Sequence, residues 1–283
     1  MRYCLVALLF AFGVFASTAN AQVTITDGTS SYTWDPLNSS SNLTSTGVAD
    51  SLFEDIWVVR FQDGQDLGGP TQVERLLSSA DEFNVVNNGD NASITFGFGS
   101  IWDATPLFDF TIDIAVSTSP GGRPKVSFDF TAEYVNSGAF NDGAGSLSIF
   151  HYFDTAMDGF GGDDVSVVDL GGGQTAMNMS TPGGTSGQHI GYDVDSFEIQ
   201  GWSGSPGANI KDRIDETYDL NNATTNLTNV DITGAFQWDF TVSTVGDTFT
   251  TSSVYAVPEP ATAGIFGALA LVGFAIRRRR RRR

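Results

Sequence analysis

Carboxylates and glycines crowd the segment between residues 154 and 164 in a pattern that suits a bound cation. Its acidic members are Asp154, Asp158, Asp163 and Asp164. Calcium takes roughly six to eight oxygen ligands from flexible loops of such composition, although the spacing here departs from that of an EF-hand. The segment is therefore a candidate calcium site, with a solvated acidic turn as the alternative.

Residues for acid, base or nucleophilic catalysis are scarce. His151 and His189 are the two histidines of the chain, and a Ser-His-Asp hydrolase needs one of them between an acid and a nucleophile. His151 falls in an alternating strand pattern, and residues 184–189 have the composition of a turn. The sequence contains no G-x-S-x-G elbow, Walker loop, dinucleotide fingerprint or zinc-protease helix. We therefore predict no catalytic residue, no enzymatic activity and no cofactor other than the candidate calcium ion.

Charge and cysteine content narrow the classes of partner. The chain has 14 lysines and arginines, of which Arg2 and the seven terminal arginines lie outside residues 22–256. Of its 33 acidic residues, only Glu259 lies outside that segment. The net charge of residues 22–256 is therefore 6 − 32 = −26. So acidic a body repels phosphate backbones, so nucleic acid is an unsuitable partner. Cys4 is the single cysteine and precedes the expected signal-peptide cleavage site. The mature protein is therefore expected to have no disulfide and no zinc–cysteine site.

The first 21 residues have the three parts of a secretory signal peptide. Arg2 supplies the positive charge, and residues 5–15 form an apolar run too short to span a bilayer comfortably. Ala19 and Ala21 place small side chains at the two positions that a signal peptidase reads. We predict export and cleavage before Gln22.

The last 27 residues combine a stiff peptide, an apolar stretch and a cationic end. The peptide is Val257, Pro258, Glu259 and Pro260, in which the prolines prevent a helix or a sheet ladder. Residues 261–276 carry no charge, and as a helix they would extend about 24 Å, enough to span a bilayer whose thickness adapts slightly. The chain ends in Arg277, Arg278, Arg279, Arg280, Arg281, Arg282 and Arg283. Such a cluster stays in the cytoplasm, so the preceding domain must lie outside.

These three parts, in this order, resemble the PEP-CTERM sorting signal. The resemblance covers residues 257–283 and implies that a membrane-embedded exosortase recognises the tail and processes the protein near the motif. The family occurs in Gram-negative bacteria that make exopolysaccharide. Its members are expected first as inner-membrane-anchored precursors and then in the outer envelope or the extracellular matrix. The segment 146–154 and the strand ending in Trp238 also resemble ectodomains that accompany such tails, with no activity implied.

Residues 22–256 have the pattern of one all-β ectodomain. Apolar and polar residues alternate over 108–116, 126–134 and 236–242, which predicts strands with one buried face. Further strands are predicted over 93–102, 147–154, 165–169 and 197–202, and short helices over 71–83 and 210–218. Residues 221–229 are polar and are expected to form a loop. The architecture predicted is an antiparallel β-sandwich, of jelly-roll type, with one or two short helices.

The leading hypothesis for function is a structural or interaction protein of the envelope or the exopolysaccharide matrix. The alternative is a carbohydrate-binding surface module, with calcium as a stabilising ion and an exposed tryptophan such as Trp202 stacking on sugar rings. A secreted glycosidase or esterase is a third reading. Glycoside hydrolysis needs two suitably spaced carboxylates, but so acidic a chain always contains such a pair somewhere.

Overall fold

The computed structural model describes residues 22–257, with gaps at 37–39, 46–51, 53, 64–71, 77–81, 100–105, 120–121, 137–144, 156–161, 182–185, 204, 206–207, 215–217 and 223. The predicted signal peptide with Ala19 and Ala21, the span 261–276 and the terminal arginines lie outside these residues. Within the described part, no helix is both long and apolar enough to cross a membrane.

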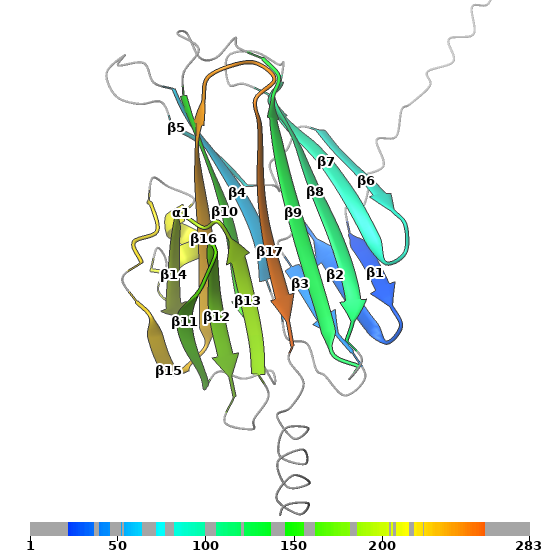
Figure 1. Ribbon diagram of the computed structural model, residues 1–283, viewed down its shortest axis with the longest axis vertical. Coiled ribbons are helices and arrows are strands. Elements are labelled where there is room, and N and C mark those ends of the chain that lie inside the picture. The colour runs from blue at the N-terminus through cyan, green and yellow to red at the C-terminus, as the bar shows by residue number, and fades with distance from the viewer. Residues whose placement is uncertain are drawn as a thin grey trace, which may run out of the picture.

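Two antiparallel sheets account for nearly all of the described chain (Figure 1). The eight-stranded sheet has the order β1 (Val23–Asp27), β2 (Ser30–Asp35), β3 (Ser40–Thr44), β4 (Glu54–Asp63), β10 (Gly145–Thr155), β16 (Ile232–Val242) and β14 (Ser196–Gly201), with β5 (Gln72–Leu76) paired to β4. The nine-stranded sheet has the order β15 (Asn226–Val230), β11 (Asp163–Gly171), β12 (Gln174–Ser180), β13 (Ser186–Tyr192), β17 (Thr248–Ala256), β9 (Pro124–Tyr134), β8 (Pro106–Thr118), β7 (Asn91–Gly99) and β6 (Glu82–Asn87).

Strand β9 shows why these sequences form sheets. Its side chains alternate strictly between buried and solvent-facing positions, because successive residues of a strand point to opposite faces. Phe128 and Phe130 are fully buried, while Asp129 between them is exposed. Between β8 and β9, Ser119 N donates to the carbonyl of Arg123 and closes the turn that joins the two strands.

The two sheets face each other across one large aromatic core. Trp57 on β4 stacks on Phe130 on β9 with ring centres 5.1 Å apart, and Phe61 on β4 stacks on Phe108 on β8 at 4.9 Å. These contacts join residues of different sheets, as expected for a sandwich in which both inner faces interdigitate. The prediction of an all-β fold with two antiparallel sheets is confirmed.

The helix predicted over residues 71–83 is wrong. The structure has strand β5 and strand β6 in this region, with 77–81 between them outside the described residues. Leu76 pairs with Val58 of β4, and Phe83 pairs with Phe96 of β7. Pairing to an existing sheet edge overrides the weak local helical spacing, because propensity is only a small contribution beside tertiary contacts.

The second predicted helix is confirmed in a shorter form. Helix α1 (Ile210–Ile214) has five residues, and its two buried isoleucines pack in a small cluster against the outer face of the eight-stranded sheet. The loop predicted over 221–229 is partly wrong, since β15 begins at Asn226. The turn predicted over 184–189 is also wrong from Ser186 onward, where β13 begins and runs between β12 and β17.

Candidate functional sites

The end of the folded domain coincides with the start of the proline-bounded peptide. Strand β17 lies in the interior of the nine-stranded sheet, between β13 and β9. Val257 follows it, is 3% exposed, and donates its N–H to the carbonyl of Pro124 over 3.1 Å. Pro258 therefore comes directly after a buried, hydrogen-bonded residue, with no spacer. The part of the motif that an enzyme can reach begins no earlier than Pro258, unless β17 leaves the sheet.

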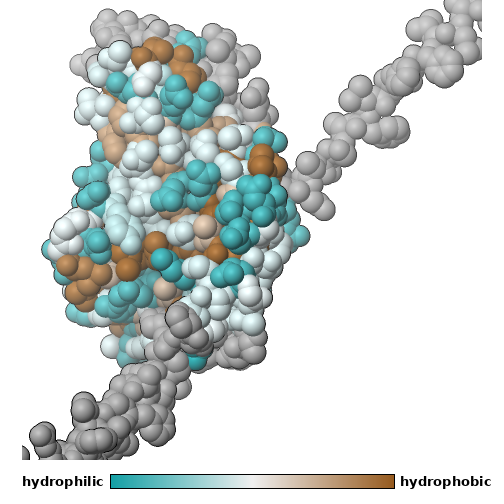
Figure 2. Space-filling model, turned by 45° about the vertical axis from the view of Figure 1, so that its right-hand side comes forward, coloured by the Kyte–Doolittle hydropathy of each residue, from teal (hydrophilic) through white to brown (hydrophobic). Residues whose placement is uncertain are grey.

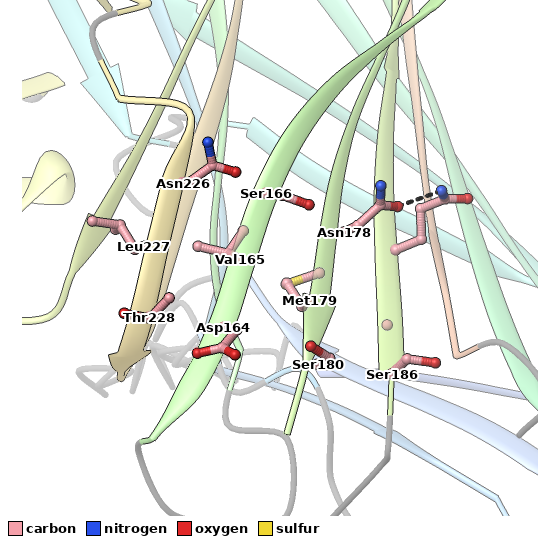
Figure 3. Close-up of a pocket in the computed structure, with 12 residues that line it drawn as sticks. Asp164, Val165, Ser166, Asn178, Met179, Ser180, Ser186, Asn226, Leu227 and Thr228 are labelled. Atoms are coloured by element: carbon pink, nitrogen blue, oxygen red, sulfur yellow. Dashed lines mark hydrogen bonds between the residues drawn. The ribbon is translucent and has the colours of Figure 1, made fainter. Parts of the chain in front are cut away.

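A groove of about 620 Å³ crosses the outer face of strands β15, β11, β12 and β13 (Figure 3). We call it the outer groove. Its floor has two cross-strand rows, set by the register of the three longer strands. The members of the rows are Asp164, Ser180 and Ser186 in one, and Ser166, Asn178 and Gln188 in the other.

The side chains that β11, β12 and β13 direct to the outer face are polar, while Val165, Met179 and Leu227 add apolar surface to the lining of the groove. Val165 and Met179 alternate with the floor residues and are buried in the core. Within the groove, Gln188 Nε2 donates to Asn178 Oδ1 over 2.6 Å, and Asp164 Oδ1 accepts the backbone N–H of Asn229 over 3.0 Å. Asp164 carries the single charge among the described residues that line the groove. Neutral amides and hydroxyls make up the rest of the polar lining.

A second constellation has the residue types of a hydrolase but lies in the core. His151 on β10 places Nε2 2.7 Å from Asp55 Oδ1 on β4, and Nδ1 2.8 Å from Ser253 Oγ on β17. Tyr32 donates to the other oxygen of Asp55 over 3.0 Å. The side chains of Asp55, His151 and Ser253 are 0% exposed, so no substrate reaches them in this conformation. Because Ser253 belongs to one sheet and the other residues to the opposite sheet, the network links the two sheets through hydrogen bonds.

His189 lies beside this network and is the one histidine without a hydrogen bond among the described residues. Its ring is 5.0 Å from that of His151 and 3.9 Å from that of Phe153, and both ring nitrogens are buried and unpartnered. Burial lowers the pKa of His189 well below its usual range, and the neighbouring His151 lowers it further. The side chain is therefore neutral in the folded protein near pH 7.

A cluster of ionisable groups occupies the end of β10. Burial, and to a smaller extent the charges of Asp231 and Glu54, raise the pKa of Asp154 to about 7, while Lys211 acts to lower it. Lys211 on α1 forms an ion pair with Glu54 over 2.8 Å. Burial also raises the pKa of Asp231. Asp154 consequently exchanges its proton close to neutral pH.

The four calcium candidates of the sequence are distributed over different surroundings. Asp154 belongs to the cluster just described, Asp163 is buried, and Asp164 points the other way into the outer groove. Asp158 lies outside the described residues. Among the described residues, no group of three or more His, Cys, Asp or Glu side chains is arranged to hold a metal ion. Calcium binding stays a prediction.

Sequence reasoning found some of these residues but not the sites. It identified Asp164 and both histidines, yet it did not anticipate Asp55 and Ser253, which lie 96 and 102 residues from His151 in the chain. No local signal marks such pairs. The outer groove was missed for the same reason, since β12 and β13 were not predicted. Trp202 was expected at the surface and is 53% exposed, next to Asp231 rather than in the groove.

The face in Figure 2 mixes hydrophilic side chains with small hydrophobic patches.

Comparison with known proteins identifies the tail and the fold. Residues 256–281 match the family model of the PEP-CTERM protein-sorting motif. This motif implies export, recognition by an exosortase, and a membrane-anchored precursor that is processed to the cell envelope. No curated protein matches the chain in sequence.

Two solved structures share the arrangement of strands at 10% sequence identity. One is a bacterial glucoamylase complexed with acarbose, with a TM-score of 0.54 over 86% of this chain and 32% of the other. The chain thus spans about a third of that enzyme's length. The other is a GalM/aldose epimerase homologue from C. elegans, with a TM-score of 0.50 over 83% of this chain and 97% of the other. Similarity at this level of identity shows the fold alone.

Proposed function

We propose that this protein, which carries a PEP-CTERM sorting motif, is a non-enzymatic structural or interaction protein of the outer envelope or the exopolysaccharide matrix. Signal peptidase cleaves it before Gln22, the span 261–276 holds the precursor in the inner membrane, and an exosortase processes it within Val257–Pro260. The observation that carries the proposal is the motif itself, placed immediately after an interior strand of the ectodomain.

The position of β17 supports processing beyond Val257. A cut before Val257 would have to open the bond between Ala256, which pairs with Lys125 in the sheet, and Val257, which is buried and bonded to Pro124. A cut at Pro258 or beyond would leave both sheets and the aromatic core intact. The ectodomain then leaves the membrane as a folded unit, and the uncharged stretch 261–276 and the arginine cluster stay behind.

Two features support a non-enzymatic role. The Asp55–His151–Ser253 network is closed to solvent, and a nucleophile and base must be within reach of the substrate to act. The outer groove presents one carboxylate among its described residues, Asp164, whereas glycoside hydrolysis ordinarily uses a pair.

Tail processing can be tested by intact-mass spectrometry of the full chain expressed with and without an exosortase. We expect a product that lacks the terminal arginines only when the exosortase is present. Glu259→Gln keeps the size of the motif residue and removes its charge, and we expect it to slow processing. Glu133→Gln changes an exposed glutamate on β9 and serves as the matched control. An intact arginine-terminated chain in both strains would refute the proposal.

Carbohydrate binding is the second candidate function, and the outer groove favours it. The groove offers amide and hydroxyl groups on an exposed sheet face, and two of the proteins that share the fold are by name a glucoamylase and an aldose epimerase homologue. Trp202 offers a separate aromatic surface. A glycan array probed with the full chain, its Trp202→Ala variant and an EDTA-treated sample would separate a tryptophan-based or calcium-dependent site from the groove.

A further inference from the structure

The floor of the outer groove is a regular array of hydrogen-bonding side chains. Directly opposed residues on neighbouring strands lie about 4.5–5.5 Å apart, so the six floor positions form a two-by-three grid (Figure 3). Many of the hydrogen-bonding groups on this floor are free to bond a ligand. The amide of Asn178 can still donate after it accepts from Gln188, and a hydroxyl such as that of Ser166 can both donate and accept.

The charges of the groove argue against an anionic ligand. No lysine or arginine is among its described lining residues, and Asp164 contributes a negative charge. The surrounding ectodomain is also strongly acidic, at 6 − 32 = −26. Phosphate, sulfate and uronate groups would therefore be repelled and would find no cationic partner.

The shape of the lining argues against a peptide. Peptide recognition on a sheet depends on apolar pockets for alternate side chains or on a free strand edge. Here Val165 and Met179 reach the lining but are almost entirely buried, and the floor strands β11, β12 and β13 are paired on both sides. A ligand that carries many neutral groups able to donate and accept hydrogen bonds fits better. Its size is bounded by the 620 Å³ volume, which is within the range of small-molecule sites.

We propose that the outer groove binds a neutral oligosaccharide without cleaving it. The rows Asp164–Ser180–Ser186 and Ser166–Asn178–Gln188 bond the sugar hydroxyls, and β15 forms one wall of the site. This rests on the proposed interaction role and assigns its ligand class. With no aromatic side chain among the described lining residues, affinity comes from hydrogen bonds that replace water. Dissociation constants in the millimolar range are expected.

The test uses saturation-transfer NMR on the full chain in detergent micelles. The probes are neutral trisaccharides of glucose, galactose, mannose and N-acetylglucosamine, with trigalacturonate as the acidic counterpart. We expect saturation transfer to at least one neutral probe and none to trigalacturonate. Asn178→Ala and Gln188→Ala should each weaken binding about five- to tenfold, as expected for loss of one or two hydrogen bonds. Thr131→Ala, on the same outer sheet face but on β9, should leave it unchanged.

Three results would overturn the proposal. One is the absence of transfer to every neutral probe at millimolar concentration. Another is binding that survives both groove variants but is lost with Trp202→Ala. The third is stronger binding of trigalacturonate than of the neutral probes. Thermal unfolding of each variant shows whether the domain is intact. Because tail processing is measured separately by mass, failure of sugar binding would leave the sorting proposal standing, and failure of processing would leave the groove assignment standing.

Discussion

Replacing His189 with leucine should stabilise the protein, and the gain should grow in acid. The two buried nitrogens of His189 have no partner among the described residues, and an unsatisfied buried polar group costs about 1–3 kcal/mol. Leucine is close in size, and a near-isosteric swap loses less than about 1.5 kcal/mol in packing against Phe153 and Phe236. We expect the variant to be more stable by about 1 kcal/mol at pH 7.5.

The pH dependence follows from the lowered pKa of His189. Its unfolded value is close to 6.5, so below that pH the unfolded chain binds a proton that the folded protein refuses. The contribution that neutral His189 makes to the stability of the folded state is complete above pH 6.5. It is lost as the pH falls toward the pKa of His189 in the folded protein. At about 1.36 kcal/mol per pH unit, wild type loses about 2 kcal/mol more than the variant between pH 6.5 and 5. Groups such as Asp154 titrate in both proteins and cancel in the difference.

Urea unfolding followed by tryptophan fluorescence measures this difference, because Trp34, Trp57 and Trp238 are buried in the core. Gln188→Leu is the matched control: it alters the adjacent side chain on the outer face, loses one hydrogen bond to Asn178, and should lower stability by about 0.5–1.5 kcal/mol, by the same amount at each pH. The reasoning fails if His189→Leu is clearly destabilised at pH 7.5. It also fails if the stability difference stays constant from pH 7.5 to 5, since His189 would then be bonded or charged in the folded core.

Two further changes probe neighbouring groups. Ser253→Ala leaves His151 Nδ1 without its partner at 2.8 Å and should lower the free energy of unfolding by about 1–3 kcal/mol in urea melts at pH 7.5; an unchanged midpoint would show that the bond adds no stability. Asp154, with a folded pKa of about 7 against an ordinary 3.8, stabilises the fold fully below pH 3.8 and loses this contribution as the pH rises through 7. Asp154→Asn should therefore be more stable than wild type at pH 8 by on the order of a few kcal/mol. Urea melts at several pH values measure this difference in stability, and a difference that does not shrink toward pH 5 would contradict the prediction.

The sequence predicts those strands whose two faces differ sharply in polarity. In β8 and β9 the phenylalanines and isoleucines alternate with aspartates and threonines, so the buried face can be read locally. Strands β13 and β17 were missed because serine, threonine and glycine occupy many of their inward positions. Ser253, on the buried face of β17, is an example. Their environment depends on partners far away in the chain, and no short-range pattern encodes it.

The candidate sites were even harder to predict from short-range sequence patterns than the strands. The tail was recognisable because its three parts are consecutive and each acts alone, through proline stiffness, apolar length and charge. The outer groove exists only because β11, β12 and β13 pair in one register, and a shift by one residue would send Asn178 inward and Met179 outward. Residue types in the sequence could not reveal that register. The same is true of Asp55 and His151, which meet only when β4 pairs with β10.

The position of β17 ties folding to sorting. This strand supplies Ser253 to the network between the sheets and separates β13 from β9, so the nine-stranded sheet cannot close until residues 248–256 are available. Those residues directly precede the proline-bounded motif that begins at Val257. The domain can therefore complete its core only when translocation has delivered nearly the whole chain, at the point where an exosortase can also reach the tail. Because Val257 is buried and bonded to Pro124, closure of the sheet places the peptide bonds up to Val257 within the folded domain.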